Sequence, residues 1–301
     1  MADKPAFLFK KEDITTIGWT DYEMLDSGNY RKLERFGERL VVRTEPVAEW
    51  KTALPEAVWD RADAVFSIGK GQSQGIWKIR EDLSRDWEIN YKGLKLILFI
   101  SGSRHIGVFP EQHPQWDWIE RKIKESGNAL SVLNLFGYTG ISTLAAARGG
   151  AMVTHVDSSK SSLERAKRNL GSSGLSNRLV RWIVDDVFKF IQREIRRGKR
   201  YDAIIMDPPN FGHGPNGEVW KFDKEISTLL SSCLKILGDN PRFFIITAYN
   251  VNSQPSDLGK WLSETMAGYS GKTVCGNLIQ KEKSAGRKIN QAIYSKWEGK
   301  D

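Results

Sequence analysis

Cysteine is scarce in this sequence, and long apolar runs are absent. The 301 residues include only Cys233 and Cys275, which lie far apart and lack the spacing of a metal site. Neither a disulfide framework nor a zinc site is predicted, so no metal is expected. No apolar run reaches the roughly 18 residues that a transmembrane helix needs. Because residues 1–6 also lack the pattern of a secretory signal, we expect a cytoplasmic protein with no membrane partner.

The charge balance is basic, while the rest of the composition is ordinary for a soluble protein. The formal net charge is +8 and the sequence pI is about 9.3. A positive excess suits a polyanionic partner, because phosphate contacts release counterions. Basic residues cluster within 189–200 and again within 281–288. Such runs also occur on solvated helix faces, so charge alone leaves nucleic-acid contact open.

The chain has two parts that differ in composition and in the pattern of their apolar runs. Residues 1–118 carry seven of the eleven tryptophans, and their short apolar runs are separated by Gly, Asp, Asn and Ser. This pattern predicts a smaller, mostly antiparallel β domain over residues 1–113, with a flexible loop at 68–76. A second domain over residues 114–301 is predicted to begin with a helix at Pro114.

Strand and helix signals alternate through the second part, as a parallel α/β sheet requires. The candidate strands are Leu130–Phe136, Met152–Asp157, Leu179–Val184, Asp202–Asp207, Phe243–Ala248, Thr273–Ile279 and Gln291–Trp297. The candidate helices between the earlier strands are Ser142–Arg148, Ser159–Leu170, Val187–Arg197, Lys221–Leu237 and Leu258–Ala267. No helix separates the last two strands, so they should pair as an antiparallel hairpin. The predicted fold class is α/β, doubly wound and Rossmann-like.

A glycine pair follows the first of these strands. Gly137 and Gly140 let the backbone turn tightly and approach a ligand at the start of a helix. The full G-x-G-x-x-G pattern is missing, which argues against a dinucleotide. Asp157, Asp186 and Asp207 follow the next three strands and should face the same crevice. Each acid alone could be a turn or N-cap residue. Together with the glycines, they predict a site for S-adenosylmethionine (SAM).

The fourth of these strands ends at Asp207-Pro208-Pro209-Asn210-Phe211. Consecutive prolines stop the strand and contribute carbonyl oxygens without N–H donors. An acid, these carbonyls and an aromatic ring then lie together, where they can accept hydrogens from an amine and stack on a flat base. The segment resembles the Asp/Asn-Pro-Pro-x-aromatic corner of SAM-dependent nucleic-acid methyltransferases. The alternative is a simple turn after a buried strand.

Four motifs together are similar to those of large-subunit ribosomal-RNA methyltransferases. They are Leu-Asn-Leu-Phe-Gly-Tyr-Thr-Gly at 133–140, Val-Asp-Ser-Ser-Lys at 156–160, Asp-Asp-Val-Phe at 185–188 and Met-Asp-Pro-Pro-Asn-Phe at 206–211. The resemblance covers roughly residues 105–300 and implies a class I methyltransferase sheet that uses SAM. By this resemblance, residues 136–140 wrap the methionine part, Asp157 binds the ribose, and Asp186 with Val187 holds the adenine.

The segment 107–112 resembles a further family motif, so Phe109 and Gln112 are expected to cover the cofactor. A linker that packs on the sheet is the alternative. The full set of predicted cofactor-binding residues is Phe109, Gln112, Asn134, Phe136, Gly137, Tyr138, Thr139, Gly140, Asp157, Ser158, Asp186, Val187 and Asp207.

The chain departs from the family members that methylate pyrimidine C5. Those enzymes need a cysteine thiolate that adds to the ring, and the resemblance places it just after the fifth strand. Here that place reads Ile-Thr-Ala-Tyr-Asn at 246–250, without cysteine. C5 chemistry is therefore disfavoured. The N-terminal part also lacks a clear resemblance to the RNA-binding module of many relatives, so the role of that part stays open.

The predicted reaction is N-methylation of a base amine, with ribosomal or other RNA as the substrate. Positioning of the nitrogen in line with the C–S bond supplies much of the rate. Asp207 and the Pro208 carbonyl would accept the amine hydrogens, with Pro209 completing the corner. Phe211 would stack on the flipped base, and Asn210 would read one edge of it.

Three further features concern the surroundings of the proline corner. Tyr249 is expected to be exposed at the sheet edge, and lining the pocket is the alternative. His213 is expected to be a loop residue and not a base. Residues 212–220 are expected to form a mobile flap over the substrate.

Other functions stay open. The same proline corner serves methylation of glutamine side chains, so a protein or small-molecule substrate is an alternative. A non-catalytic RNA-binding protein with this fold is another. A nucleotide-dependent oxidoreductase is a third and is disfavoured by the missing glycine pattern.

Overall fold

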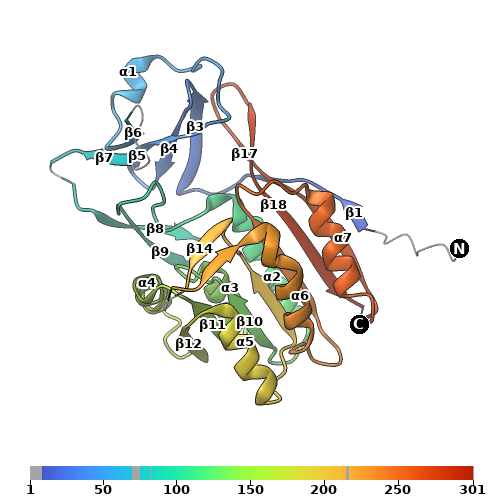
Figure 1. Ribbon diagram of the computed structural model, residues 1–301. Helices are drawn as coiled ribbons and strands as arrows, with labels where there is room; N and C mark the ends of the chain where they lie inside the picture. The colour runs from blue at the N-terminus through green and yellow to red at the C-terminus, as the bar shows by residue number, and fades with distance from the viewer. Residues whose placement is uncertain (1–8, 70–74, 82, 215–216, 301) are drawn as a thin grey trace, which may run out of the picture.

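Alternating strands and helices in the second part of the chain build one central sheet (Figure 1). The computed structural model describes residues 9–69, 75–81, 83–214 and 217–300. The strands predicted from the sequence are present as β10 (Ser131–Leu135), β11 (Met152–Asp157), β12 (Val180–Val184), β13 (Ala203–Met206), β16 (Phe243–Ala248), β17 (Gly271–Lys281) and β18 (Lys288–Gly299).

The order of these strands is that of a doubly wound sheet. It reads β17-β18-β16-β13-β10-β11-β12, so the chain starts in the middle, moves outward to β12 and returns to the other side. The five strands β12, β11, β10, β13 and β16 run parallel, and β17 and β18 form the antiparallel hairpin. The predicted α/β fold is confirmed.

Helices cover both faces of this sheet (Figure 1). They are α2 (His113–Glu125), α3 (Ile141–Gly149), α4 (Lys160–Ser172), α5 (Val187–Arg196), α6 (Phe222–Leu234) and α7 (Pro255–Thr265). Side chains of α2 and α3 pack with one set of strand residues, including Val132 and Ile205. Side chains of α5, α6 and α7 pack with the alternate set, including Leu133 and Ile204. This alternation places successive strand residues in opposite layers, as the pleat of a strand requires.

The helix starts have identifiable local causes. Ser159 caps α4, because its Oγ accepts a hydrogen bond from the backbone N–H of Ser162 at 3.2 Å. Gln254 and Asp257 form a reciprocal capping box at the start of α7, which has Pro255 at its first position. These residues satisfy N–H groups that have no partner inside the helix.

The first part of the chain forms two further sheets, one at the top of Figure 1 and one at its left side. A five-stranded sheet contains β3 (Tyr22–Gly28), β4 (Arg31–Phe36), β5 (Arg39–Thr44), β6 (Ala64–Ile68) and β7 (Gly75–Ile79). A hairpin contains β8 (Asp86–Tyr91) and β9 (Leu94–Phe99), and a short helix, α1 (Glu56–Trp59), precedes β6. Among the described strand pairs of these two sheets only β5 and β6 are parallel. The region is therefore mostly antiparallel, as predicted.

Two short strands tie the beginning of the chain to the central sheet. They are β1 (Phe9–Lys11) and β2 (Ile14–Thr16), and both pair in parallel with β17. An aromatic cluster also joins the two parts of the chain, because Trp19 and Tyr91 pack against Trp116 of α2. The domain boundary at residue 113 stays a prediction. Backbone hydrogen bonds cross it, because β1 and β2 pair with β17.

Some sequence predictions fall partly or wholly on residues outside the described ranges. The N-terminal segment 1–6 lies there, and so do residues 70–74 of the predicted loop 68–76. The rest of that loop belongs mainly to the ends of β6 and β7. Within the described ranges, no helix is both long and apolar enough to cross a membrane.

Candidate active site

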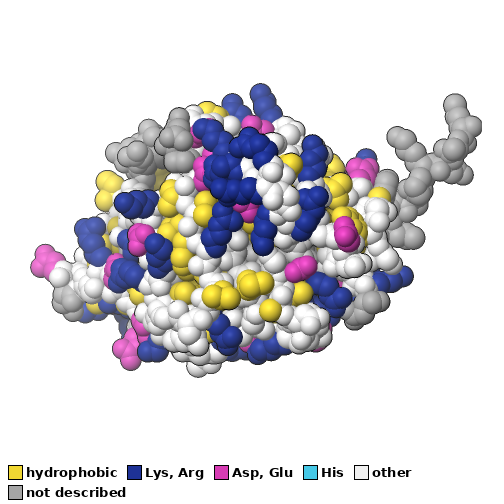
Figure 2. Space-filling view, turned by 90° about the horizontal axis from the view of Figure 1, so that it is seen from below, with side chains coloured by type: hydrophobic (Ala, Val, Ile, Leu, Met, Phe, Trp, Pro, Cys, Tyr) yellow, Lys and Arg dark blue, Asp and Glu magenta, His cyan; other side chains and the backbone are white. Residues whose placement is uncertain are grey.

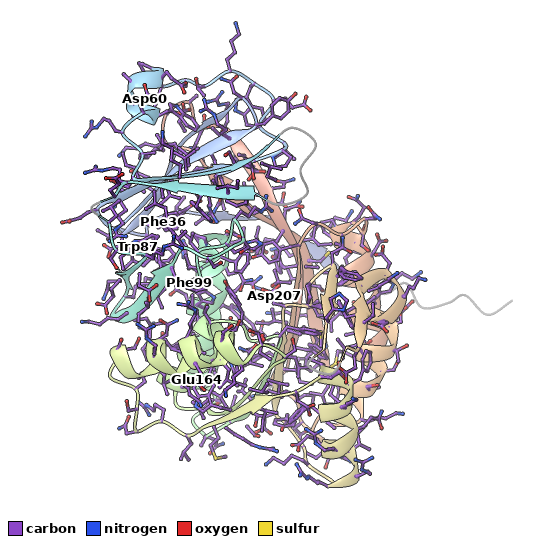
Figure 3. All side chains as sticks on the ribbon, turned by 60° about the vertical axis from the view of Figure 1, so that its left-hand side comes forward. Phe36, Asp60, Trp87, Phe99, Glu164 and Asp207 are labelled. Carbon is purple, nitrogen blue, oxygen red and sulfur yellow. The ribbon has the colours of Figure 1, made fainter. Side chains whose placement is uncertain are left out.

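A cavity of about 630 Å³ opens at the carboxyl ends of the central strands. Its walls come from the loops after β10, β11, β13 and β16, from the segment before α2, and from β4 and β5 of the N-terminal sheet. A narrower cleft adjoins it and shares Phe109, Phe136, Tyr138 and Asp207 with it. Figure 3 shows Asp207 inside the molecule, at the level where the N-terminal sheet meets the central sheet. This volume lies within the range of small-molecule sites.

The glycine loop after β10 is tightly constrained. Phe136 and Tyr138 have positive φ angles of 56° and 49°, and Gly140 has φ of 82°. A Cβ added to Gly137 would lie 2.4 Å from the His155 ring, and one on Gly140 would lie 2.7 Å from the Ala166 Cβ. Side chains are therefore excluded at both glycines. Non-glycine residues in this conformation cost about 1–3 kcal/mol each and are concentrated at functional sites.

Asp157 connects this loop to the end of β11. Its Oδ2 accepts a hydrogen bond from the Tyr138 backbone N–H at 2.8 Å, and its Oδ1 accepts one from the Ser159 N–H at 2.8 Å. Burial raises the pKa of Asp157, and the two N–H groups oppose that rise. Each carboxylate oxygen accepts more than one hydrogen bond. Asp157 and Ser158 both line the cavity, so a ligand hydroxyl pair can still be accepted there.

Asn134 and Thr139 make internal hydrogen bonds that shape the narrow cleft. The Asn134 Nδ2 donates to the Thr143 Oγ1 at 2.8 Å, and the Thr139 Oγ1 donates to the Gly107 carbonyl at 2.7 Å. Both side chains are buried, and both residues line the cleft. The second bond anchors the segment 107–112 to the glycine loop, which brings Phe109 and Gln112 over the predicted cofactor residues.

Asp186 and Val187 lie apart from the other predicted residues. Neither is among the residues that line the cavity or the cleft. The Asp186 carboxylate caps α5 by accepting the Lys189 N–H at 3.0 Å, and Val187 is buried in the layer formed by α5, α6 and α7. Their assignment to the adenine stays a prediction.

Of the proline corner, Asp207, Pro209, Asn210 and Phe211 line the cavity, whereas Pro208 is buried and lines neither the cavity nor the cleft. The Gln112 Nε2 donates to the Asp207 Oδ2 at 2.8 Å. Burial raises the pKa of Asp207 to about 7, the Gln112 hydrogen bond opposes the rise, and the nearby Glu111 adds to it. The Asn210 Nδ2 donates to the Asn250 carbonyl at 2.7 Å, and the Phe211 side chain is 54% exposed. Asp207 and Phe211 thus line the same cavity, and their roles toward an amine and a base stay predictions.

The predicted flap is partly a regular structure. Residues Phe211–His213 and Val219–Lys221 form β14 and β15, which pair antiparallel, and residues 215–216 lie outside the described ranges. The Trp220 Nε1 donates to the Pro209 carbonyl at 2.5 Å. His213 is exposed in β14, packs edge-on against Phe211 and does not line the cavity. It is a strand residue, not the loop residue expected.

Tyr249 is not the exposed residue that we expected. Its hydroxyl accepts a hydrogen bond from the Gln112 Nε2 at 3.0 Å, and its ring lies 4.9 Å from that of Phe109. Tyr249 lines the cavity, and burial together with Glu111 and Asp207 raises its pKa well above the ordinary value. The expectation of exposure was wrong because the segment 107–112 covers the end of β16, a contact that the local sequence does not encode.

Sequence analysis also missed the wall contributed by the N-terminal sheet. Lys32 of β4 lies 3.3 Å from a carboxylate oxygen of Glu45, and its Nζ donates to the Gln291 Oε1 at 3.1 Å. The Gln291 Nε2 in turn donates to the Glu45 Oε2 at 2.9 Å. These groups are far apart in sequence and line the same cavity. Only the tertiary fold brings them together, so no local motif could have identified them.

Neither cysteine is placed for catalysis. Cys233 is buried in α6 and Cys275 in β17, and neither lines the cavity or the cleft. Burial raises the pKa of both thiols, which disfavours the thiolate. In the part of the chain that the structure describes, no group of three or more His, Cys, Asp or Glu residues is arranged to hold a metal ion.

Comparisons with known proteins agree with this geometry. The family model of S-adenosylmethionine-dependent methyltransferases matches residues 42–230. A SAM-dependent methyltransferase structure from Agrobacterium tumefaciens superposes with a TM-score of 0.92 at 38% identity and covers 97% of this chain and 96% of that chain. A putative SAM-dependent methyltransferase from Streptococcus mutans, with a TM-score of 0.71 and 21% identity over 93% of this chain and 75% of its own, shares the fold.

A curated relative gives a partial match. The ribosomal RNA large subunit methyltransferase I of Cronobacter sakazakii is 30% identical over 192 residues, which are 60% of this chain and 48% of that protein. The chain thus spans about half the length of the curated relatives it matches. The cavity at the strand ends, the strained glycine loop and the family match over more than half of the chain lead to one conclusion: this chain belongs to the S-adenosylmethionine-dependent methyltransferase family.

Proposed function

We propose that this protein transfers a methyl group from SAM to an amine of an RNA base. The observation that carries the proposal is the position of Asp207. Its carboxyl group lies between the glycine loop on one side and the exposed Phe211 on the other, and it lines both the cavity and the adjoining cleft. A hydrogen-bond acceptor at that point is what an amine needs when it attacks a methyl group held beside the loop.

The residues of the loop and of β11 fit the cofactor. The two glycines leave a cradle that any Cβ would fill, and the main-chain turn at residues 136–140 forms its wall. We assign Phe136, Tyr138 and Phe109 to the apolar contacts with the cofactor, and Asp157 to its ribose hydroxyls. When bound, SAM supplies a methyl carbon that is already electrophilic because it is attached to a sulfonium.

The residues of the proline corner would act on the other substrate. Asp207 and the Pro208 carbonyl accept the amine hydrogens, which turns the nitrogen lone pair toward the methyl carbon. Phe211 stacks on the face of a base that has left its helix or loop. Asn210, whose amide already donates to the Asn250 carbonyl, keeps its own carbonyl oxygen for the base edge. After transfer, the nitrogen carries an extra proton, and Asp207 accepts it.

The absence of a usable thiol supports an amine as the target. Both cysteines are buried away from the cavity, so no residue can form the covalent adduct that pyrimidine C5 requires. Tyr249 stands at the end of β16, where the resembling C5 enzymes carry their cysteine. A phenol hydrogen-bonded to Gln112 can orient a base but is not a thiolate nucleophile.

RNA as the substrate is supported by relatives and by charge. Curated relatives with about 30% identity are named ribosomal RNA large subunit methyltransferase I, and we extend that substrate class to this chain. Figure 2 shows Lys and Arg side chains gathered on the face seen from below, where α5 ends. We call the exposed cations Arg178, Arg181, Arg196, Arg197, Lys199 and Arg200 the basic face. Arg181 and Arg197 both pair with Glu194 of α5. RNA as the substrate also implies action in the cytoplasm.

Two cations of the second basic run, 281–288, have a different role. The Arg287 Nη2 donates to the Asp26 Oδ1 at 2.9 Å and to the Ser27 carbonyl at 2.9 Å, and Lys283 pairs with Glu23 at 3.1 Å. These bonds fasten the turn between β17 and β18 to β3 of the N-terminal sheet. We therefore assign RNA contact to the basic face and structural pairing to Lys283 and Arg287.

The proposal is tested by SAM calorimetry followed by transfer of a radiolabelled methyl group to unmodified large-subunit ribosomal RNA. We expect SAM binding in the wild type, weaker binding in Asp157→Ala, and label in the RNA. SAM binding without label in RNA would redirect the search to proteins and small molecules. Absence of SAM binding would overturn the proposed activity.

A further inference from the structure

A continuous chain of buried polar groups connects Asp207 to the N-terminal sheet. It begins at Gln112, whose Nε2 donates both to the Asp207 Oδ2 at 2.8 Å and to the Tyr249 hydroxyl at 3.0 Å. Tyr249 is hydrogen-bonded in turn to the carboxyl group of Glu111. The Gln280 Nε2 donates to the Glu111 Oε2 at 3.0 Å. Glu111 itself is only 3% exposed.

The chain continues into β3, β4 and β5. The Gln280 Nε2 also donates to the Tyr22 hydroxyl at 2.8 Å, and that hydroxyl donates to the Glu34 Oε1 at 2.8 Å. Arg43 holds Glu34 through two bonds of 2.7 and 2.8 Å. A buried carboxylate is costly unless it is paired. Glu34 has Arg43 for that purpose, whereas no cation pairs directly with Glu111 among the ion pairs of the described residues.

Burial of the Glu111 carboxyl group therefore costs free energy, and the hydrogen-bonded chain connects this group to Asp207. It belongs to the segment 107–112 that covers the cavity, and it lines the cavity itself. Its carboxyl group adds to the rise in the pKa of Asp207, and burial raises the pKa of Glu111 as well. A glutamine at position 111 removes the charge but leaves one acceptor oxygen for the hydrogen bonds from Gln280 and Tyr249.

We propose that Glu111 is a positioning residue for methyl transfer, which acts through Tyr249 and Gln112 to hold the Asp207 carboxyl in the orientation and protonation state that receives the amine hydrogen. The inference rests on the proposed function. In the step itself, the nitrogen–methyl bond forms as the sulfur–methyl bond breaks, and the sulfonium becomes a neutral thioether. The extra proton on nitrogen passes to Asp207. Glu111 touches neither reactant.

Several other titratable groups face the same space. From the central part of the chain these are Tyr138, Asp157 and Tyr249, and from the N-terminal part they are Lys32, Arg43, Glu45, Arg104 and His105. Burial raises the pKa of Glu111, and Lys32 and Arg43 oppose that rise. His105 is held neutral, because burial and the neighbouring cations lower its pKa to about 4. These groups stay the same in a Glu111 variant, so a change in the pKa of Asp207 reports the loss of the Glu111 charge.

The direct test is a titration of Asp207 by carbon-13 NMR of aspartate carboxyl groups, with Asp207→Asn used for assignment. Removal of the nearby negative charge in Glu111→Gln should lower the pKa of Asp207, so its titration should move to lower pH. The matched control is Glu194→Gln, because Glu194 is also fully buried but pairs with Tyr201, Arg181 and Arg197 in a different region. That variant should leave the titration of Asp207 in place.

The pH profile of methyl transfer gives the second readout. The acidic limb of kcat/KM should shift to lower pH in Glu111→Gln, with SAM affinity unchanged. Tyr249→Phe keeps the ring contact with Phe109 and removes the hydroxyl, so its kcat should fall about tenfold with SAM affinity unchanged. If Glu111→Gln does not fold, the fall in kcat of Tyr249→Phe at unchanged SAM affinity tests the connection instead. An unchanged Asp207 titration in Glu111→Gln overturns the inference. The titration needs no RNA, so failure of the inference is distinguishable from failure of the proposed substrate.

Discussion

The two sides of the cavity are built by different means. On the cofactor side, the main chain forms the wall: two glycines, two non-glycine residues with positive φ, and backbone N–H groups that hold Asp157. On the substrate side, buried side chains form the wall, and Lys32, Glu45 and Glu111 come from separate elements. A backbone cradle accepts one ligand shape. A side-chain wall can change with little effect on the fold, so substrate choice should reside there.

The largest effect is expected at the boundary between the two sides. Asp207→Ala removes the acceptor of the amine hydrogens, so methyl transfer should fall roughly 10²–10⁴-fold, the range for a general base. SAM affinity should change little, because the glycine loop and Asp157 are intact. Single-turnover rates and calorimetry measure the two quantities. Asp239→Ala, an exposed acid in the loop before β16, is the control. Equal loss of SAM binding and rate would place Asp207 on the cofactor side.

On the cofactor side, Asp157→Ala should weaken SAM binding by about 2–3 kcal/mol, because it removes a charged acceptor of two backbone N–H groups and of the ribose hydroxyls. The dissociation constant from calorimetry measures this loss. The rate at saturating SAM should remain close to that of the wild type. A lower saturated rate with unchanged affinity would contradict the assignment of Asp157.

The pKa of Asp207 also makes stability depend on pH. Its folded pKa is about 7, above the ordinary value of 3.8, so the native state keeps a proton that the unfolded chain has lost. Between about pH 4 and pH 7 this group therefore lowers stability as the pH rises, by on the order of 2 kcal/mol for a half-buried group. Asp207→Asn should remove that slope. Urea unfolding of both proteins across this pH range checks the prediction, and identical slopes would contradict it.

The backbone cradle can be tested at one glycine. Gly140→Ala combines a φ of 82° with a Cβ only 2.7 Å from the Ala166 Cβ, so the free energy of unfolding should fall by about 1–3 kcal/mol. SAM affinity should fall as well. Gly174→Ala is the matched control, because Gly174 has φ of 68° with no atom within 4 Å of an added Cβ. It should show a smaller loss of stability and normal SAM binding. Equal effects of the two substitutions would show that the contact with Ala166 is unimportant.

The smallest effect is expected far from the cavity. α5 begins at the cavity edge of the sheet and ends about 15 Å away, where the basic face lies. Reversal of charge at Arg196, Lys199 and Arg200 should weaken RNA binding about tenfold and reduce its salt dependence, with SAM binding unchanged. Fluorescence anisotropy over a salt series measures both. If RNA affinity does not change when these charges are reversed, the basic face does not contact the RNA.

Prediction from the sequence succeeded where a local pattern determines the structure. The alternation of apolar runs and helix signals predicted the central sheet, and β11 and β16 have the predicted bounds. Most of the predicted site residues line the cavity or the adjoining cleft, because parallel strands bring their carboxyl ends to one edge. Asp186 was also predicted to face the cavity, but its carboxylate caps α5 and does not line the cavity.

The contribution of the N-terminal sheet could not be predicted. Lys32 and Gln291 meet through packing between strands that are distant in sequence, and no spacing rule connects them. The same reason explains the error at Tyr249, which is covered by a segment that precedes it by more than a hundred residues. Glu111 is an acid in a short segment, and its proximity to Asp207 became visible only after folding.

Mass spectrometry of methylated nucleosides distinguishes amine methylation of RNA from its alternatives. The protein is incubated with SAM that carries a deuterated methyl group and with unmodified large-subunit ribosomal RNA, and the RNA is digested to nucleosides for mass spectrometry. We expect a nucleoside with the deuterated methyl group on a base nitrogen, and we expect this nucleoside to be absent when Asp207→Ala replaces the wild type. A deuterated methyl group on pyrimidine C5 would contradict amine methylation of RNA. So would SAM binding without a deuterated methyl group in any nucleoside.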